Sequence, residues 1–268
     1  MNISILGCGW YGRALARSLL QKGYHVKGSA TSLEKLTLLA SAKINPCLVK
    51  ITAEEDSIID VDFFNCEILV VAFNTKMNDT ENYLAKIRNL VSLIHQHQVK
   101  KIIFISSISV YGDHNTVVNE SSIPQPQKNS GKSLLAAELL LTRDKFFTTS
   151  VIRFGGLAGP GRDPANFLAG KTLVPNGLAP INLIHLEDCI GITESVIRLG
   201  AGNGLFNAVA PHHPAKMDFY TRAAKKHAVL TPSFIEEKNQ WKIVETIHLP
   251  VLHYKFIVSN WFDWLKTQ

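Results

Sequence analysis

The first thirty residues constrain the fold more than any other part of the chain. A short apolar run leads directly into Gly7-Cys8-Gly9-Trp10-Tyr11-Gly12, and a helical pattern and a second apolar run over residues 24–30 follow. A G-x-G-x-x-G pattern between a strand and a helix is typical of a β-α-β unit that binds a dinucleotide. Gly7 permits the tight turn, Gly9 leaves room for a pyrophosphate, and Gly12 lets the helix lie close to the strand. The pattern therefore predicts a site for NAD(H) or NADP(H), and the alternative is a glycine-rich turn with no ligand.

Strand-like and helix-like segments alternate over the first 155 residues. The sequence predicts strands at Asn2–Leu6, Tyr24–Ala30, Asn45–Leu48, Ile68–Ala72, Lys101–Ser106 and Thr149–Phe154. It predicts helices at about Tyr11–Lys22, Leu33–Ser41, Asp79–Gln98 and Ser130–Asp144. Several of these strands are continuous apolar runs, as expected when helices cover both faces of a parallel sheet. We therefore predict an α/β fold in which residues 1–155 form a Rossmann-type, doubly wound parallel sheet.

The character of the chain changes after residue 155, where glycine and proline interrupt the pattern. Short elements are expected at Asn182–His185, Glu187–Leu199, Gly204–Ala208 and Ala215–Ala228, and the aromatic segment Trp261–Leu265 has helical spacing. We expect residues 156–268 to form a small C-terminal α+β lobe that binds substrate. Open α/β folds place ligands at the carboxyl ends of the strands, so the lobe should lie there. Interleaving of the two parts stays open.

Composition narrows the range of functions. The 46% hydrophobic and 19% charged content of the 268 residues is that of an ordinary globular protein, and no apolar run approaches the roughly 18 residues of a membrane span. The four cysteines are scattered, which argues against a disulfide scaffold or a zinc site and suits a reducing cytoplasm. The net charge of +6 is spread along the chain rather than clustered. We expect a cytoplasmic monomer or homodimer with a small-molecule substrate, and no metal, nucleic acid or membrane partner.

The segment after the second predicted strand bears on the choice of cofactor. Sites specific for NAD usually carry an Asp or Glu there, which accepts hydrogen bonds from the ribose 2′-hydroxyl. This chain has Gly28-Ser29-Ala30-Thr31-Ser32, followed by Lys35, with no acid before Glu34. Hydroxyls and a nearby cation suit a 2′-phosphate, so NADP(H) is favoured over NAD(H). Thr31 or Ser32 also fits the N-cap of the next helix.

A serine-rich segment after the fifth predicted strand points to a family. The segment Ser106-Ser107-Ile108-Ser109-Val110-Tyr111-Gly112 resembles the S-S-x-x-V-Y-G segment of extended short-chain dehydrogenases/reductases, the epimerase/dehydratase-like superfamily. His185-Leu186-Glu187-Asp188 resembles the His-x-x-Asp entry to a C-terminal helix of that superfamily. The stretch from Arg153 through Gly159-Pro160-Gly161-Arg162 to Gly170 is similar to the atypical YeeZ-like subgroup. The resemblance covers about residues 1–230.

The resemblance implies roles for named residues. The candidate catalytic residues are Ser106, Ser107 and Tyr111, because the serines of the family lie near the nicotinamide and help to bind the substrate oxygen. The candidate cofactor-binding residues are Gly7, Cys8, Gly9, Trp10, Tyr11, Gly12, Ser29, Thr31, Ser32, Ala72, Phe73, Asn74, Ser106 and Phe154. Arg153 and Arg162 are suited to grip a carboxylate or phosphate of a substrate, and His185 is a third candidate substrate-binding residue. The alternatives are an ion pair between the lobes for Arg153 and a structural, satisfied histidine for His185.

One departure from the superfamily bears on activity. Active members normally carry Tyr-x-x-x-Lys at the start of the helix after the serines, where the tyrosine exchanges a proton with the substrate. Alignment of Ala136-Ala137-Glu138 with the end of that motif puts Ser130 at the tyrosine position and Leu134 at the lysine position. Serine cannot replace a phenol poised near neutral pH, and leucine has no charge. We predict an NAD(P)-binding oxidoreductase or epimerase-like enzyme without the standard pair. The alternative is a catalytically inactive NAD(P)-binding sensor or regulatory protein.

Overall fold

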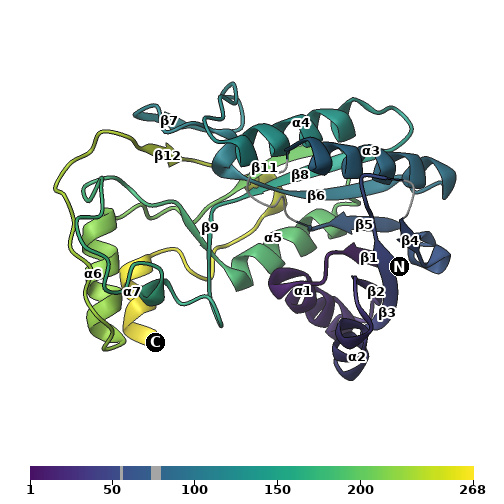
Figure 1. Ribbon diagram of the computed structural model, residues 1–268, viewed down its shortest axis with the longest axis horizontal. Coiled ribbons are helices and arrows are strands. Elements are labelled where there is room, and N and C mark those ends of the chain that lie inside the picture. Colours follow the sequence, from purple (N-terminus) through teal and green to yellow (C-terminus); the bar gives the residue numbers. More distant parts are fainter. Residues whose placement is uncertain (55–56, 74–79) are drawn as a thin grey trace.

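An eight-stranded sheet runs through the centre of the computed structural model, which describes residues 1–54, 57–73 and 80–268 (Figure 1). The strand order is β11-β8-β6-β5-β1-β2-β3-β4. The bounds are β1 Asn2–Leu6, β2 His25–Ala30, β3 Asn45–Lys50, β4 Ile58–Ile59, β5 Ile68–Val71, β6 Lys101–Ser107, β8 Thr148–Phe154 and β11 Gly204–Ala208. All neighbours are parallel except β4, which is antiparallel to β3. The chain adds strands first on one side of β1 and then on the other, so the predicted doubly wound sheet is confirmed.

Helices cover both faces of this sheet. The helices α1 (Trp10–Gln21), α2 (Leu33–Ser41) and α5 (Leu186–Arg198) lie on one face, and α3 (Thr80–Gln96) and α4 (Asn129–Arg143) lie on the other (Figure 1). Alternate residues of β5 enter the two apolar cores, with Ile68 and Val70 in one and Leu69 and Val71 in the other. Successive strand side chains point to opposite faces, so a continuous apolar run is the pattern that such a two-sided core requires.

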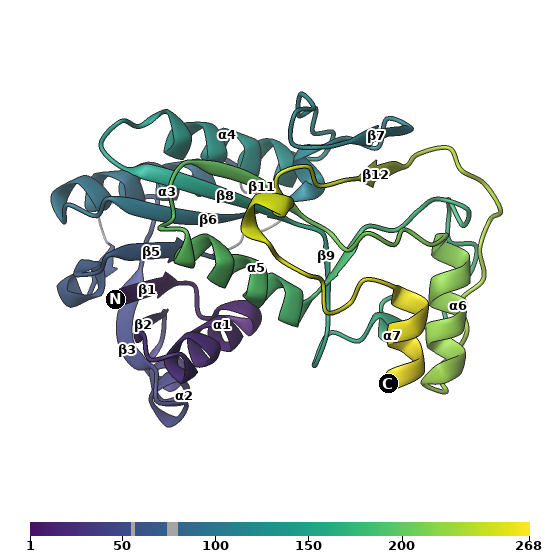
Figure 2. The same cartoon turned by 180° about the vertical axis from the view of Figure 1, so that it is seen from behind.

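The C-terminal part is interleaved with the sheet. Two of its elements, α5 and β11, join the layers of the N-terminal part, and β12 (Lys242–Val244) pairs with β7 (Thr116–Val118). The remaining elements form a small lobe in which α6 (Lys216–Lys226) and α7 (Trp261–Thr267) lie side by side, beyond the end of the sheet toward which β1 points (Figures 1 and 2). Trp261 of α7 is fully buried against Phe219 of α6. The aromatic C-terminus therefore packs against the lobe, as its spacing predicts.

The differences from the predicted elements lie in short strands. The sequence does not indicate β4, β7, β12 or β9 (Gly156–Ala158), which pairs with β10 (Leu183–His185). Each has only two or three residues, and β7 and β12 pair across more than a hundred residues of chain. The long predicted strands and helices are present, with ends that coincide with those expected or lie within two residues of them. The first residue of the third predicted helix, Asp79, lies outside the described residues.

Asp188 fastens the last part of the chain to α5. Its side chain is fully buried and accepts hydrogen bonds from the Tyr254 hydroxyl at 2.8 Å and from the backbone N–H groups of Ile257 and Val258 at 2.7 and 3.1 Å. The His-x-x-Asp segment thereby joins the sheet layers to the segment that leads into α7. Within the described ranges, no helix combines the length and apolar character needed to cross a membrane.

Candidate cofactor and substrate site

The glycine loop between β1 and α1 has the geometry that its pattern predicts. Gly7 adopts φ +101°, a conformation that favours glycine, and its N–H donates to Ser29 Oγ at 2.8 Å. A Cβ on Gly12 would lie 2.4 Å from the Gly7 carbonyl oxygen, so only glycine lets α1 approach the loop this closely. A Cβ on Gly9 would meet no atom within 4 Å. The loop is therefore tight on its inner side and open beside Gly9.

The N-terminus of α1 is open to an anion. Gly9 is the N-cap residue, no side chain caps the helix, and the first turn contains no acidic residue. The first intrahelical bond runs from Arg13 N–H to the Gly9 carbonyl at 3.1 Å. The preceding N–H groups have no partner further back in the helix, and the helix dipole adds positive charge at this end. Such an end is suited to bind phosphate groups.

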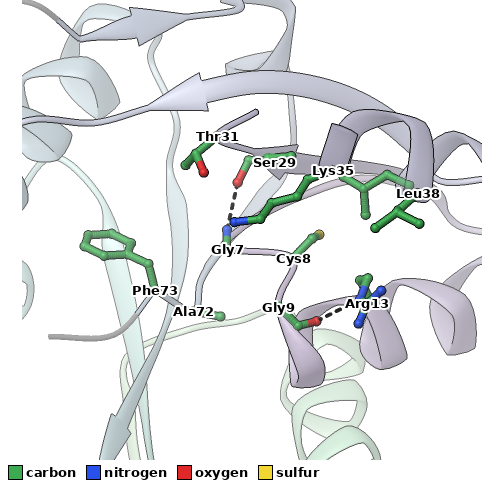
Figure 3. A pocket seen from close by; sticks show the side chains of 12 residues that line it. Gly7, Cys8, Gly9, Arg13, Ser29, Thr31, Lys35, Leu38, Ala72 and Phe73 are labelled. Carbon is green, nitrogen blue, oxygen red and sulfur yellow. Dashed lines mark hydrogen bonds between the residues drawn. The ribbon is translucent and has the colours of Figure 1, made fainter. Parts of the chain in front are cut away.

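A cavity of about 400 Å³ lies beside the glycine loop (Figure 3). Arg13 of α1 and Lys35 of α2 line it together with Ser29 and Thr31. A second cavity of about 160 Å³ shares Gly7, Ser29, Thr31 and Phe73 with the first, and its other lining residues are Leu6, Val49, Lys50, Ile51, Tyr83 and Lys86. Hydroxyls, cations, an open helix end and an apolar recess suit the phosphates, ribose and base of a dinucleotide.

The predicted cofactor-binding residues divide into two groups. Seven of them line the larger cavity, namely Gly7, Cys8, Gly9, Ser29, Thr31, Ala72 and Phe73. Ser32 is the N-cap residue of α2 but makes no side-chain capping bond. Burial raises the pKa of the Cys8 thiol to about 12, so this thiol stays protonated at neutral pH. Asn74 lies outside the described residues.

The remaining predicted cofactor contacts point elsewhere. The Tyr11 side chain is buried, with its hydroxyl 2.7 Å from Thr193 Oγ1, and Phe154 packs edge-on against its ring. Trp10 turns toward the C-terminal lobe, where its indole N–H donates to the Pro160 carbonyl at 2.6 Å. Sequence reasoning missed Arg13, although it directly follows the glycine pattern on the first turn of α1. It also missed Lys50 and Lys86, whose approach to the cavity depends on the packing of β3 and α3.

Two of the candidate catalytic residues belong to a buried polar network. The Ser106 hydroxyl donates to Glu138 Oε1 at 2.6 Å. The Tyr111 hydroxyl lies 2.9 Å from the Asn119 carbonyl and 3.1 Å from Asn207 Oδ1, and burial raises the pKa of this phenol. The serine and the tyrosine are 5% and 2% exposed. Their polar groups therefore face protein partners and not an open cavity.

Arg153 completes this network. Its guanidinium donates to both oxygens of Glu138, at 3.0 and 2.6 Å, and to the Tyr111 oxygen at 2.6 Å. Arg153 and Glu138 are 3% and 4% exposed. Of the two alternatives for Arg153, the geometry agrees with an ion pair, but the pair joins β8 to α4 and does not bridge the lobes. Arg153 could bind a substrate anion only if its bidentate pair with Glu138 were broken.

Ser107 differs from its neighbour. It is half-buried, and its hydroxyl oxygen accepts a hydrogen bond from Ser109 N–H at 3.1 Å, which caps a short 3₁₀ turn over Ile108–Val110. The hydroxyl proton is not used in this bond. Ser107 is therefore the candidate catalytic residue whose hydroxyl keeps a free proton at the carboxyl end of β6.

The start of α4 lies against the serine segment. A Cβ on Gly131 would sit 2.2 Å from the Ser109 carbonyl oxygen, so the two backbones are in close contact. Ser130 is half-buried at the second position of α4, and Leu134, one turn later, packs on the apolar clusters beneath the helix. The residues aligned with the tyrosine and lysine of the superfamily thus lie on the expected helix.

The other two candidate substrate-binding residues have different surroundings. His185 is buried, and its Nδ1 accepts a hydrogen bond from Glu187 N–H at 3.4 Å as the N-cap of α5. Burial lowers the pKa of this imidazole, which agrees with the structural alternative. Arg162 is exposed, and its guanidinium lies 4.7 Å from the centre of the Trp10 ring, next to the glycine loop. No cluster of three or more metal-ligating side chains exists among the residues described.

Together, the strand order, the glycine loop and the serine-tyrosine segment define a dinucleotide-binding protein of the extended short-chain dehydrogenase/reductase class. A family model described as NAD(P)H-binding matches residues 7–172. Protein YeeZ of Escherichia coli K12 is 34% identical over 239 residues, which cover 87% of this chain and 86% of YeeZ. The chain therefore belongs to the NAD(P)H-binding family, as a YeeZ-like extended short-chain dehydrogenase/reductase.

Solved structures agree with this fold. MoeE5 in complex with UDP-glucose and NAD superimposes with a TM-score of 0.80 at 17% identity, over 100% of this chain and 97% of MoeE5. UDP-glucuronic acid 4-epimerase from Bacillus cereus in complex with NAD has a TM-score of 0.79 at 18% identity, over 100% and 97% of the two chains. At these identities the similarity defines the fold alone.

Proposed function

We propose that the protein is an NADP(H)-dependent oxidoreductase or epimerase-like enzyme that acts on a small-molecule substrate. The observation that carries the proposal is the pair of cavities at the glycine loop, which share four lining residues. Four cations line them, namely Arg13, Lys35, Lys50 and Lys86, and no carboxylate does so within the described residues. NAD-selective sites use a carboxylate at the ribose, which would repel a 2′-phosphate. A cationic lining supports the phosphorylated cofactor.

The cofactor preference is tested on Arg13 and Lys35, the two cations that line the larger cavity. Loss of one exposed cation that contacts a phosphate costs about 1 kcal/mol, or about fivefold in affinity. We expect Arg13→Ala and Lys35→Ala each to weaken NADPH binding by about this factor and to leave NADH binding unchanged, as measured by calorimetry. Lys145→Ala, at the opposite end of the sheet, is the control. Equal losses for NADPH and NADH would argue against a 2′-phosphate contact.

The cofactor supplies hydride chemistry when it is bound, and the chain must supply a proton donor or acceptor. Ser130 and Leu134 stand where the superfamily carries tyrosine and lysine, and Tyr111 and Ser106 have protein partners. Ser107 combines partial exposure with a free hydroxyl proton, which supports a role in binding and orienting a substrate oxygen. A proton would then pass through this hydroxyl or through water.

Turnover is tested by following reduced nicotinamide while candidate substrates are supplied. Nucleotide sugars come first, because MoeE5 and the Bacillus cereus UDP-glucuronic acid 4-epimerase have both been solved in complex with a UDP-sugar and NAD. With an active substrate, Ser107→Ala should lower kcat by about a hundredfold or more, the usual size of a proton-transfer contribution, without changing NADPH affinity. Ser109→Ala, two residues away and also half-buried, should retain activity. Equal losses in the two variants would contradict a specific role for Ser107.

The second candidate function is a catalytically inactive NAD(P)-binding sensor or regulatory protein. The bidentate Arg153–Glu138 pair favours it, because groups that could grip or protonate a substrate are committed to a buried network. A sensor would bind the cofactor as tightly as an enzyme and respond to its redox state without turnover. Tight NADPH binding combined with no turnover on any substrate would support this candidate over the enzyme.

A further inference from the structure

Arg162 carries a cation that the protein itself does not neutralise. Its side chain makes no hydrogen bond or ion pair with any residue in the described part of the chain, and it is exposed. Its guanidinium carbon lies over the Trp10 indole, 4.7 Å from the ring centre. This environment contrasts with that of Arg153, whose guanidinium is fully paired. Arg162 therefore has all its N–H donors available for a ligand.

The backbone around Arg162 holds this side chain in place. Arg162 N–H donates to the Gly159 carbonyl at 2.8 Å, and Gly159 N–H donates to the Arg162 carbonyl at 3.2 Å, which closes a tight turn. The indole N–H of Trp10 donates to the Pro160 carbonyl within that turn at 2.6 Å. One tryptophan thus fixes the turn through its N–H and supports the guanidinium on its ring face, an arrangement that favours cation–π contact.

Arg162 is held beside the N-terminus of α1, which already carries partial positive charge. Trp10 is the first residue of α1, whose N-terminus has no side-chain cap and no acidic residue in its first turn. A guanidinium beside a helix N-terminus is electrostatically unfavourable, because the helix dipole has its positive end there. An anion between the two would remove the repulsion and gain hydrogen bonds from both. Gly9, which precedes Trp10 in the chain, has no atom within 4 Å of the position of a Cβ.

We propose that Arg162 is a phosphate-binding residue of the cofactor site, which closes from the C-terminal lobe over the pyrophosphate held at the N-terminus of α1. Trp10 acts as the platform that positions the guanidinium. The inference rests on the NADP(H) binding of the proposed function. It differs from the expectation that Arg162 binds a substrate anion, because the residue would act before any substrate is present.

The test compares ligands with and without a pyrophosphate, and no substrate is added. Dissociation constants are measured by calorimetry for NADPH, for 2′-phospho-ADP-ribose, and for 2′-AMP, which lacks the pyrophosphate. Arg162→Met should weaken the binding of NADPH and of 2′-phospho-ADP-ribose by about tenfold to a hundredfold, as expected for lost charge-assisted hydrogen bonds. The dissociation constant of 2′-AMP should stay within about twofold of its value in the unmodified protein. Arg222→Met is the matched control, since Arg222 is also an exposed arginine stacked on an aromatic ring, that of Phe262 in the lobe.

The platform is tested by a double-mutant cycle. Trp10→Leu should weaken NADPH binding. Arg162→Met should then reduce NADPH affinity much less in the Trp10→Leu background than in the unmodified protein, because the guanidinium is no longer held in place. Trp10→Phe, which keeps the ring face, should retain most of the affinity. Additive effects of the two substitutions would contradict the platform.

Three results would overturn the inference. The first is unchanged binding of NADPH and 2′-phospho-ADP-ribose in Arg162→Met. The second is a fall in 2′-AMP binding that parallels the fall in NADPH binding. The third is an effect that arises only when substrate is added. The last result would return Arg162 to the substrate. If the unmodified protein binds none of these ligands, the proposed function fails with it. If the unmodified protein binds them and Arg162→Met binds them equally well, this inference alone fails.

Discussion

At the scale of the residue, the glycine loop has opposite tolerances at two positions. Gly12 faces backbone, because its Cβ would lie 2.4 Å from a carbonyl oxygen, whereas the Cβ of Gly9 would face open space. Side-chain bulk at Gly12 therefore acts on folding, and bulk or charge at Gly9 acts on ligand binding. The two substitutions separate the structural and functional parts of one motif.

The first prediction follows from this difference. Gly12→Ala should lower the free energy of unfolding by about 1–3 kcal/mol, as overpacking against a rigid neighbour does, measured by urea denaturation. Gly9→Asp should fold with nearly unchanged stability but should lose NADPH binding, because a carboxylate would occupy and repel the phosphate position. Unchanged NADPH affinity in Gly9→Asp would contradict the assignment of this loop to the cofactor.

At the scale of the element, the Arg153–Glu138 pair joins β8 to α4 at the carboxyl end of the sheet. Both groups are buried, so each charge depends on the other for compensation. Removing one partner of such a pair usually costs 3–5 kcal/mol, because an unpaired charge stays buried, whereas replacing both by apolar residues can cost much less.

The second prediction concerns this pair. Glu138→Leu should lower the free energy of unfolding by about 3–5 kcal/mol, and the double variant Glu138→Leu/Arg153→Met should recover most of the loss. Denaturant titration of the single and double variants measures both values. If the double variant loses as much free energy of unfolding as the two single variants added together, the two charges do not depend on each other for compensation. A double variant that also keeps NADPH affinity would separate the network from cofactor binding.

The third prediction concerns the N-cap of α5. Burial lowers the pKa of His185, against the opposing effect of Glu187 and Asp188. Below the unfolded pKa of about 6.5, the unfolded chain binds more protons at this site than the folded chain, so stability falls as the pH falls. Burial shifts His212 and His213 in the same direction.

Thermal melts between pH 7.5 and pH 5 should therefore show falling stability. His185→Asn keeps a side chain that suits an N-cap and removes one of the titrating groups, so its loss of stability over the same interval should be smaller. An unchanged pH dependence in His185→Asn would mean that His185 does not contribute to it.

At the scale of the whole molecule, three contacts between segments far apart in the sequence join the C-terminal part to the sheet and the glycine loop. Trp10 reaches the turn at Pro160, Asp188 captures the segment at 254–258, and β11 extends the main sheet beside β8. The hydrogen bond from the Trp10 indole to the Pro160 carbonyl therefore links the N-terminus of α1 directly to the C-terminal part of the chain.

The sequence predicts the parts of the molecule whose causes are local. The alternating apolar runs and the glycine pattern depend on neighbouring residues, so the sheet, its helices and the loop could be read from them. The pairing of Arg153 with Glu138 could not be predicted from the sequence, because it depends on how α4 packs over β8. The contact of Trp10 with Pro160 joins residues 150 positions apart, and no local pattern signals it.

The central claim is that the cavities beside the glycine loop hold NADP(H). The most direct measurement is thermal-shift stabilisation of the unmodified protein by NAD⁺, NADH, NADP⁺ and NADPH at matched concentrations. A ligand that binds only the folded state raises the melting temperature according to its affinity. We predict a larger shift with NADP⁺ and NADPH than with the two cofactors that lack the 2′-phosphate. A larger shift with NAD⁺ or NADH would contradict the phosphate assignment, and no shift with any of the four would contradict the cofactor site itself.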